Sequence, residues 1–325
     1  MIDEVAPDVF RVEVPLPNSP LKSINSYVIR GCDRHLVIDT GMMRPECERA
    51  LAAGLDELDV DLARTDFFIT HFHADHLGLV SQFASDTSTV YFNALEAKLA
   101  ASFGDARTFW ERMAAFGRVE GIPESAIQEA VREHPGAKYG APAYPDFTLV
   151  GEGDVIRAGD YRFECVATPG HTPGHLCLYD RERKVLVSGD HVLGDITPNI
   201  SAWFGNVNAL DDYLASLEKV SQLHAALVLP GHRNTFEDLQ GRVAELEHHH
   251  QERAQEVLAI VATGGKTAYE TASEMSWDID AATWEAFPVL QQWFATGEAD
   301  SHLRYLENRG ALRHEMRDGA AVFCV

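Results

Sequence analysis

This 325-residue chain has few cysteines, few basic residues and no long apolar run. Its five cysteines are scattered, odd in number and without a Cys-x-x-Cys pair, which argues against a disulfide framework and indicates reduced thiols. No apolar run approaches the ~20 residues of a membrane span. The first residues, Met1 to Glu4, have neither the basic nor the apolar stretch of a secretory signal. The sequence therefore predicts a cytoplasmic protein without a membrane segment.

Positive charge is also scarce, because 27 Lys and Arg residues stand against 50 Asp and Glu residues, for a net charge of −23. Such a field repels phosphate backbones, so the expected partner is a small-molecule substrate and not a nucleic acid. A local basic patch would escape this argument. Hydrophobic residues make up 46% of the chain, as in ordinary globular proteins, and the length predicts one large domain or two.

Histidine is concentrated in one short segment, where His71, His73, Asp75 and His76 follow a strand-like apolar run. Buried imidazoles without partners cost free energy, and three so close would repel one another if protonated. A divalent cation removes both problems, because it binds neutral imidazoles and a carboxylate together. The segment therefore predicts a metal site on a loop at a strand end.

Three later segments each consist of an apolar run, a glycine turn and a residue that can bind a metal. These segments place His171, Asp190 and His232 after Gly170, Gly189 and Gly231. Glycine permits the tight turns and close backbone approach that such loops need. Together with the first segment, they predict one site assembled from several strand ends.

This pattern resembles the metallo-β-lactamase superfamily, and within it the glyoxalase II-like hydrolases, over roughly residues 8–240. The resemblance implies two groups of metal ligands joined by one bridging carboxylate. The ligands are His71, His73 and His171 for the first metal, Asp75, His76 and His232 for the second, and Asp190 as the bridge. It also implies that Asp39, in an Asp-Thr-Gly motif, supports the metal loop from behind the ligands.

The resemblance also bears on the metal. His73, where the diiron oxygen reductases of the superfamily have glutamate, favours a zinc-type hydrolase. The complete second ligand group argues against the single-iron dioxygenases of the superfamily. The expected cofactors are therefore two divalent ions, with zinc as the expected metal. Iron and manganese stay open, because the same histidine and aspartate side chains accept them.

Strand-rich halves with helices between them suit the fold that the resemblance implies, a four-layer αββα sandwich at residues 1–240. A helical insertion at about 94–140 separates the halves. Its large apolar side chains could line an apolar pocket above the metals or pack the insertion onto the sandwich, and the sequence leaves both alternatives open. These side chains are Phe103, Phe109, Trp110, Met113 and Phe116.

Residues 241–325 are predicted to form a separate C-terminal domain with a winged-helix-like pattern. Helical runs at 242–261, 284–294 and 299–308 precede an Asp-Gly turn that predicts a hairpin. Basic residues in this segment are offset by acidic ones. A role in packing, as a lid or as a homodimer contact is therefore expected over DNA binding.

Two details of the C-terminal segment can be tested against the structure. The Thr267-x-x-Glu270 spacing predicts a capping box and thus a helix start. His248, His249 and His250 stand on one helical run, where successive side chains point in different directions and cannot converge on one ion. They are therefore predicted to lie on the helix surface.

The predicted function is hydrolysis of a small ester, thioester or lactone by a metal-bridging hydroxide, because metal binding lowers the pKa of water to about 7. Asp75 is the predicted proton acceptor. The alternative is a metal-dependent phosphodiesterase or single-stranded nuclease of the same superfamily, which needs a basic groove. Convergence of four basic residues at the site would favour that alternative: Arg107, Arg112, Lys138 and Arg233. A non-catalytic scaffold would have lost ligands, and none is lost.

Overall fold

The computed structural model describes residues 1–102, 106–141, 143–202, 208–279 and 281–325, without the side chains of 106–108. The insertion residue Phe103 lies outside this part. The chain divides into two compact units. The first comprises Met1–Gly104, Tyr139–Pro198 and Ser216–Val243, and the second comprises Asp105–Lys138, Asn199–Ala215 and Ala244–Val325.

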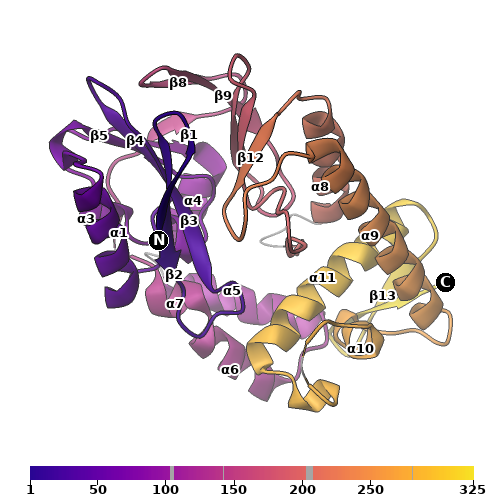
Figure 1. Ribbon diagram of the computed structural model, residues 1–325. Coiled ribbons are helices and arrows are strands. Elements are labelled where there is room, and N and C mark those ends of the chain that lie inside the picture. Colours follow the sequence, from indigo (N-terminus) through magenta and orange to yellow (C-terminus); the bar gives the residue numbers. More distant parts are fainter. Residues whose placement is uncertain (103–105, 142, 203–207, 280) are drawn as a thin grey trace. The chain divides into compact units, whose positions relative to one another are not determined.

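The first unit is built on two β-sheets within the described residues (Figure 1). One sheet has the order β1 (Ile2–Ala6), β2 (Val9–Pro15), β3 (Ser23–Ile29), β4 (His35–Ile38), β5 (Thr65–Phe68), β6 (Val90–Asn93), β7 (Thr148–Val150). Strands β1 to β4 pair antiparallel, and β4 to β7 pair parallel. The carboxyl ends of the parallel strands therefore meet at one edge, where loops can carry functional groups.

The second sheet is antiparallel except for one pair of strands. Its order is β12 (Leu227–Pro230), β11 (Val185–Gly189), β10 (Leu176–Asp180), β9 (Tyr161–Ala167), β8 (Val155–Ala158). Strands β11 and β12 run parallel, so their carboxyl ends also lie side by side.

The two sheets pack face to face through one apolar core. Strands β3, β10 and β11 are buried along their whole length, as expected for strands covered on both faces. Buried side chains of both sheets meet in this core: Val9, Tyr27, Ile29, Leu36, Ile38 and Phe68 with Ile156, Ala158, Tyr161, Phe163, Cys165, Leu176, Leu178, Val185, Val187 and Leu229.

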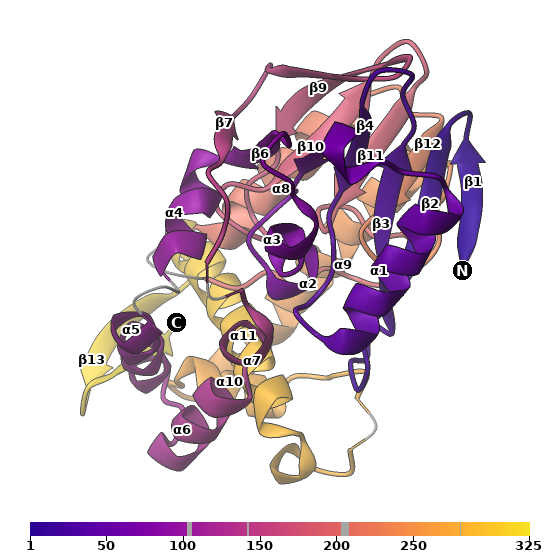
Figure 2. The ribbon, with the colours of Figure 1, turned by 90° about the vertical axis from the view of Figure 1, so that its left-hand side faces the viewer.

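Helices cover the outer faces of the two sheets. Beside the first sheet lie α1 (Pro45–Glu57), α2 (Ala74–Leu77), α3 (Val80–Phe83) and α4 (Ala94–Ser102), with a short 3-10 turn at Leu62–Arg64 (Figure 2). The helix α1 begins at Pro45, a favoured first helical residue, and packs so closely on β2 that a Cβ at Gly54 would meet Val12 at 2.5 Å. Beside the second sheet, Lys219 of α8 (Ala209–Ser221) donates to the Ala167 carbonyl of β9. The layering is the predicted αββα order.

The second unit is mainly helical. Its elements are α5 (Ala106–Val119), α6 (Glu124–Glu133), most of α7 (Pro135–Tyr139) and of α9 (Leu239–Val261), α10 (Ala268–Glu274), a 3-10 turn (Trp284–Ala286), α11 (Val289–Asn308), β13 (Arg313–Arg317) and β14 (Ala320–Cys324). Helices α9, α10 and α11 and strand β14 share one buried apolar cluster. Within the insertion, Phe109 and Met113 are buried and Trp110 is half-buried.

Two predictions for the second unit are confirmed. Thr267 accepts a hydrogen bond from the Glu270 N–H, and the Glu270 side chain accepts one from the Thr267 N–H, which completes the capping box. Strands β13 and β14 form the hairpin, and both turn residues, Asp318 and Gly319, have positive φ, as an Asp-Gly turn requires. The winged-helix pattern as a whole stays a prediction.

Two other predictions were wrong. The runs at 284–294 and 299–308 are not separate helices, because α11 continues unbroken through Gly297, a residue that weakens a helix but does not have to end it. His250 does not lie on the helix surface. It is only 1% exposed, and its Nδ1 atom lies 3.2 Å from His302 Nε2 on α11. Local spacing could not show that α11 covers this side of α9.

No helix in the described ranges combines the length and the apolar character needed to cross a membrane.

Candidate metal centre

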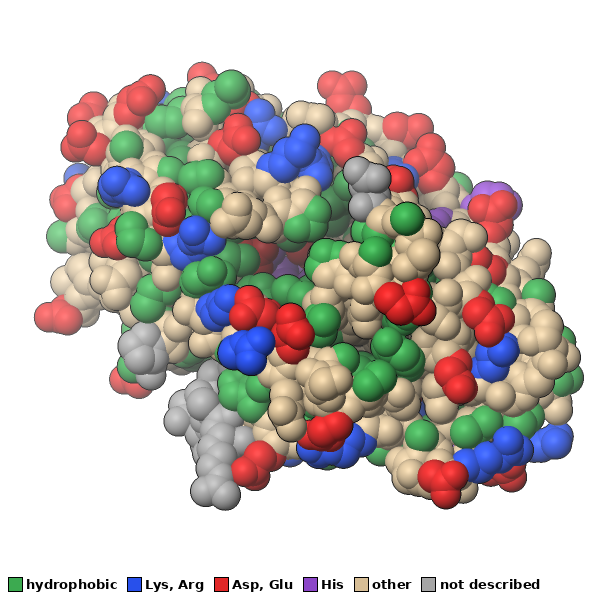
Figure 3. Space-filling view, turned by 90° about the horizontal axis from the view of Figure 1, so that it is seen from below, with side chains coloured by type: hydrophobic (Ala, Val, Ile, Leu, Met, Phe, Trp, Pro, Cys, Tyr) green, Lys and Arg blue, Asp and Glu red, His purple; other side chains and the backbone are tan. Residues whose placement is uncertain are grey.

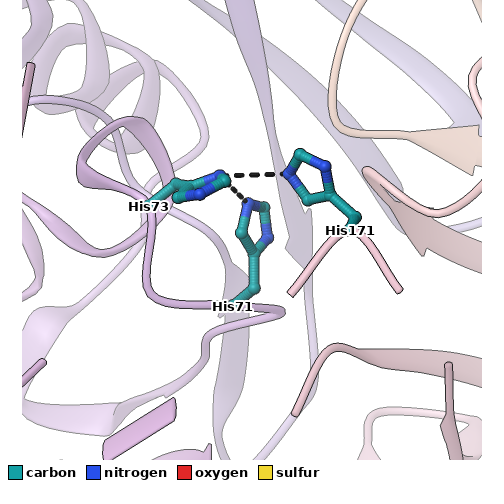
Figure 4. Close-up of side chains that lie close together, drawn as sticks. All are labelled: His71, His73 and His171. Atoms are coloured by element: carbon teal, nitrogen blue, oxygen red, sulfur yellow. Dashed lines mark hydrogen bonds between the residues drawn. The ribbon is translucent and has the colours of Figure 1, made fainter. Parts of the chain in front are cut away.

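Three imidazoles converge in a first ligand group (Figure 4). His71 and His73 lie on the loop between β5 and α2, and His171 lies on the loop between β9 and β10. The Nδ1 atom of His73 is 2.9 Å from His71 Nε2 and 3.0 Å from His171 Nε2. A tetrahedral zinc ion with nitrogen ligands at about 2.0–2.1 Å would hold such atoms about 3.3 Å apart. The three nitrogen atoms therefore stand near the spacing that one zinc ion requires.

A second ligand group combines a carboxylate with two imidazoles, from Asp75, His76 and His232. Asp75 and His76 lie in the short helix α2, and His232 follows β12. The Nε2 atom of His232 is 3.5 Å from the Oδ2 atom of Asp75. The three ligand atoms lie within 4.8 Å of one another, which one divalent cation can span.

The carboxylate of Asp190 faces both groups. Its Oδ2 atom is 3.7 Å from His171 Nε2 in the first group and 3.4 Å from His232 Nε2 in the second. It is also 3.5 Å from His76 Nε2. The structure thus brings all seven predicted side chains together, in the two groups that the sequence analysis expected. Their role as metal ligands stays a prediction.

Several polar atoms of this centre are buried without a hydrogen-bonding partner: His76 Nε2, His232 Nε2 and Asp190 Oδ1. The Nδ1–H of His232 donates to the Ser23 carbonyl at 2.7 Å, which leaves the Nε2 atom facing the centre. Buried polar atoms without partners cost free energy, and coordination of cations would satisfy them. Imidazoles and carboxylates are ligands of zinc, iron and manganese, so the residues fit such ions.

Asp39 supports this centre from behind His76. Its Oδ2 atom is 2.7 Å from His76 Nδ1, and its Oδ1 atom accepts the Thr70 N–H at 2.8 Å. The hydroxyl of Thr70 donates to the same carboxylate. An acceptor at Nδ1 turns the other nitrogen of the His76 ring toward the centre.

The two groups differ in protonation when no metal is bound. Burial, and next the neighbouring imidazoles, lower the pKa of His71 well below its ordinary value. Burial would also lower the pKa of His76, but Asp39 and Asp190 raise it well above that value. Burial would lower the pKa of His232 as well, but Asp190 first and Asp75 next raise it to about 10. Cation binding at the second group must therefore displace protons.

Gly231 allows the His232 loop to approach the centre closely. A Cβ atom at Gly231 would lie 2.5 Å from Asp190 Oδ1 and 2.9 Å from His76 Cε1. Any larger residue would displace two of the predicted ligands. The Gly-His pair after β12 is therefore required by packing around the centre.

His175 contacts the backbone of the predicted bridge. Its Nε2 atom accepts the Asp190 N–H at 3.2 Å, and its Nδ1 atom pairs with the Thr168 hydroxyl at 2.8 Å. Glu96 was not predicted from the sequence, yet its buried carboxylate accepts two N–H groups from the loops that carry the predicted ligands. A glutamate in the first turn of a helix is too common to signal such a role.

The sequence profile of the metallo-beta-lactamase superfamily matches residues 20–232, which include all seven predicted ligands. The chain belongs to the metallo-β-lactamase superfamily. The predicted resemblance and the predicted fold are thereby confirmed. The prediction that the protein is an enzyme of this superfamily is confirmed as well.

Two similar proteins carry names that describe an activity. The human protein named acyl-coenzyme A thioesterase MBLAC2 is 30% identical over 226 residues, which are 65% of this chain and 74% of that protein. The Emericella nidulans protein named atrochrysone carboxyl ACP thioesterase is 24% identical over 321 residues, which are 98% of this chain and 84% of that protein.

Solved structures support the fold along the whole chain. A metallo-beta-lactamase family protein from Thermus thermophilus is 27% identical with a TM-score of 0.83, over 99% of both chains. A beta-lactamase domain protein from Burkholderia ambifaria is 26% identical with a TM-score of 0.81, over 99% of this chain and 93% of that one.

Proposed function

We propose that this protein is a two-metal hydrolase that cleaves small thioesters. The observation that carries the proposal is the convergence of two ligand groups on the carboxylate of Asp190. The names of the two relatives, at 30% and 24% identity, favour a thioester among the predicted ester, thioester and lactone bonds. Since the donor set suits more than one metal, zinc is proposed as the resident ion.

The proposed ligands are those expected from the sequence: His71, His73 and His171 for the first ion, Asp75, His76 and His232 for the second, and Asp190 between them. When bound, two such ions would lower the pKa of a water molecule to about 7 and polarise the carbonyl of the substrate. The protein contributes the orientation of both groups, through contacts such as that of Asp39 with His76.

Asp75 is the proposed proton acceptor. It is 8% exposed and belongs to the second ligand group. Burial would raise its pKa, but His232 lowers the pKa to about 2. The carboxylate is therefore ionised at neutral pH and able to accept a proton from the attacking nucleophile or pass one to the leaving thiol.

The phosphodiesterase alternative serves as the comparison in the test. Of the basic residues that would favour it, Arg112 and Lys138 belong to the second unit and Arg233 to the first, and the Arg107 side chain lies outside the described residues. Lys138 pairs with Glu133. Acidic side chains stand among the basic ones on the face shown in Figure 3. These observations do not favour a phosphate-binding groove.

The test measures metal content by elemental analysis together with turnover of three substrates: an acyl-coenzyme A thioester, a lactone and a bis-phosphodiester. About two metal ions per chain and turnover of the thioester are expected. His71→Ala should lose metal and activity together, because His71 belongs to the first ligand group. A metal-free active protein, or turnover of the phosphodiester alone, would overturn the proposal.

Further features predicted from the sequence stay proposals. They are the division into a catalytic domain at 1–240 and a winged-helix-like domain at 241–325, the insertion as a lid, a homodimer contact and a cytoplasmic location.

A further inference from the structure

Glu96 is a buried carboxylate that joins two loops of the proposed metal centre. It lies in the first turn of α4, and its side chain is 0% exposed. Its Oε2 atom accepts the N–H of Phe72 at 2.7 Å, and its Oε1 atom accepts the N–H of Gly174 at 2.6 Å. Phe72 stands between His71 and His73 in the chain. Each carboxylate oxygen thus holds a different ligand loop.

The loop that contains His171 is pressed against the start of α4 at Gly174. A Cβ atom at Gly174 would collide with the side-chain oxygen of Asn93 and lie 3.0 Å from Glu96 Cγ. Asn93 is itself fixed, because its Oδ1 atom accepts the Leu95 N–H at 2.8 Å. The start of α4 is therefore a rigid support for this loop, and Glu96 is the hydrogen-bonding part of that support.

We propose that Glu96 is a positioning residue of the metal centre, which holds the loop of His71 and His73 against the loop of His171. This inference rests on the proposed function, because it assumes that the three imidazoles bind an ion. Glu96 is not itself a ligand in this proposal. It acts through the backbone on both sides of the first ligand group, as residues behind metal ligands commonly do.

Glu96→Gln tests the role with little change in volume. A glutamine has one acceptor oxygen and an NH₂ group, so it can accept one of the two N–H groups and must direct a donor at the other. The two loops can then no longer be held in the same way. Glu96→Asp keeps both acceptor oxygens on a shorter side chain, and it serves if the glutamine variant does not fold.

Asp180 provides a matched control in the same unit. It is 2% exposed, and its two oxygens accept the N–H groups of Arg162 at 2.7 Å and Arg183 at 2.8 Å. Asp180→Asn therefore removes the same kind of bond at the other end of β10. A general loss of stability should appear in both variants, whereas an effect on the metal should appear only at Glu96.

The experiment titrates the metal-free proteins with cobalt(II) and follows the absorption spectrum of the bound ion, with thermal unfolding as a parallel measurement. For Glu96→Gln, or Glu96→Asp if needed, we expect the affinity for one of two ions to fall about 10- to 100-fold, with an altered cobalt spectrum. For Asp180→Asn we expect the affinity and spectrum of the unchanged protein.

Equal cobalt affinity and spectrum in the Glu96 variant and the unchanged protein would overturn this inference alone. An equal loss of cobalt affinity in the Asp180 variant would also overturn it, because the effect would then be general. Failure of the unchanged protein to bind cobalt would overturn the proposed function, and the inference with it.

Discussion

Both units of the protein bury histidines, but they use them in different ways. In the first unit, ring nitrogens of five histidines converge with two carboxylates, and the groups that could hold a metal among the described residues all lie there. In the second unit, His250 and His302 form a pair at 3.2 Å, and His302 Nδ1–H donates to the Glu298 carbonyl at 2.8 Å. Burial alone therefore does not mark a metal site.

The arrangement of lone pairs distinguishes the two clusters. A hydrogen-bonded chain runs from His250 to His302 and on to the backbone of α11, so both ring nitrogens of neutral His302 have partners without any ion, and Nε2 of His250 is left without one. Around Asp190, by contrast, nitrogen atoms face one carboxylate from three loops, and three buried atoms without partners belong to this one centre. The predictions below test whether this difference separates metal binding from packing.

The largest effect is expected for Asp190→Ala, which removes the carboxylate between the ligand groups. Mutation of a residue that only orients a metal ligand already lowers metal affinity or activity about 10- to 100-fold. Loss of Asp190, a proposed ligand, should therefore lower kcat/KM for the thioester by more than about 100-fold. Elemental analysis should show fewer ions per chain. Asp180→Ala, at a carboxylate that bonds the backbone of Arg162 and Arg183, should keep its metal. Full metal content and activity in Asp190→Ala would break the comparison.

A smaller effect is expected for Asp39→Asn. The carboxylate lies 2.7 Å from His76 Nδ1 and orients that ring, so the variant should bind metal about 10- to 100-fold more weakly. A competition titration with a metal chelator measures this change. Unchanged affinity would mean that the Thr70 loop holds His76 without help from Asp39.

Acid should destabilise the second unit through its histidine pair. Burial lowers the pKa of His302 to about 4, so the unfolded chain binds the proton first as pH falls below about 6.5. The contribution of neutral His302 to the free energy of unfolding is on the order of 3 kcal/mol. It is complete above about pH 6.5 and is lost as the pH falls to about 4. Chemical unfolding of the metal-free protein at several pH values measures the slope of the free energy of unfolding against pH. It should be shallower in His302→Gln, and an equal slope in both proteins would contradict the assignment.

The smallest effect on the metal is expected for His250→Leu. Loss of the donor leaves His302 Nε2 without its partner, which should cost about 1–3 kcal/mol of unfolding free energy. Metal content and thioester turnover should stay as in the unchanged protein. Loss of metal in this variant would show that the two clusters are coupled, contrary to the comparison.

The seven candidate ligands could be predicted because each one stands in a short segment after a strand. Residues 71–76 carry four of the seven, and Gly-His or Gly-Asp pairs mark the others. The capping box at Thr267 and the hairpin turn at Asp318 were equally local, and the structure confirms both. Patterns within a few residues depend on backbone geometry that the sequence specifies directly.

The sequence by itself therefore determined the superfamily, the αββα fold and the candidate ligands. The tertiary structure decided which side chains meet across the chain. Glu96 contacts Gly174 from 78 positions away, and His250 meets His302 from 52 positions away. Such pairs arise from the packing of elements on one another, and a glutamate in a first helical turn or a histidine on a polar helix has no local pattern that reveals its partner.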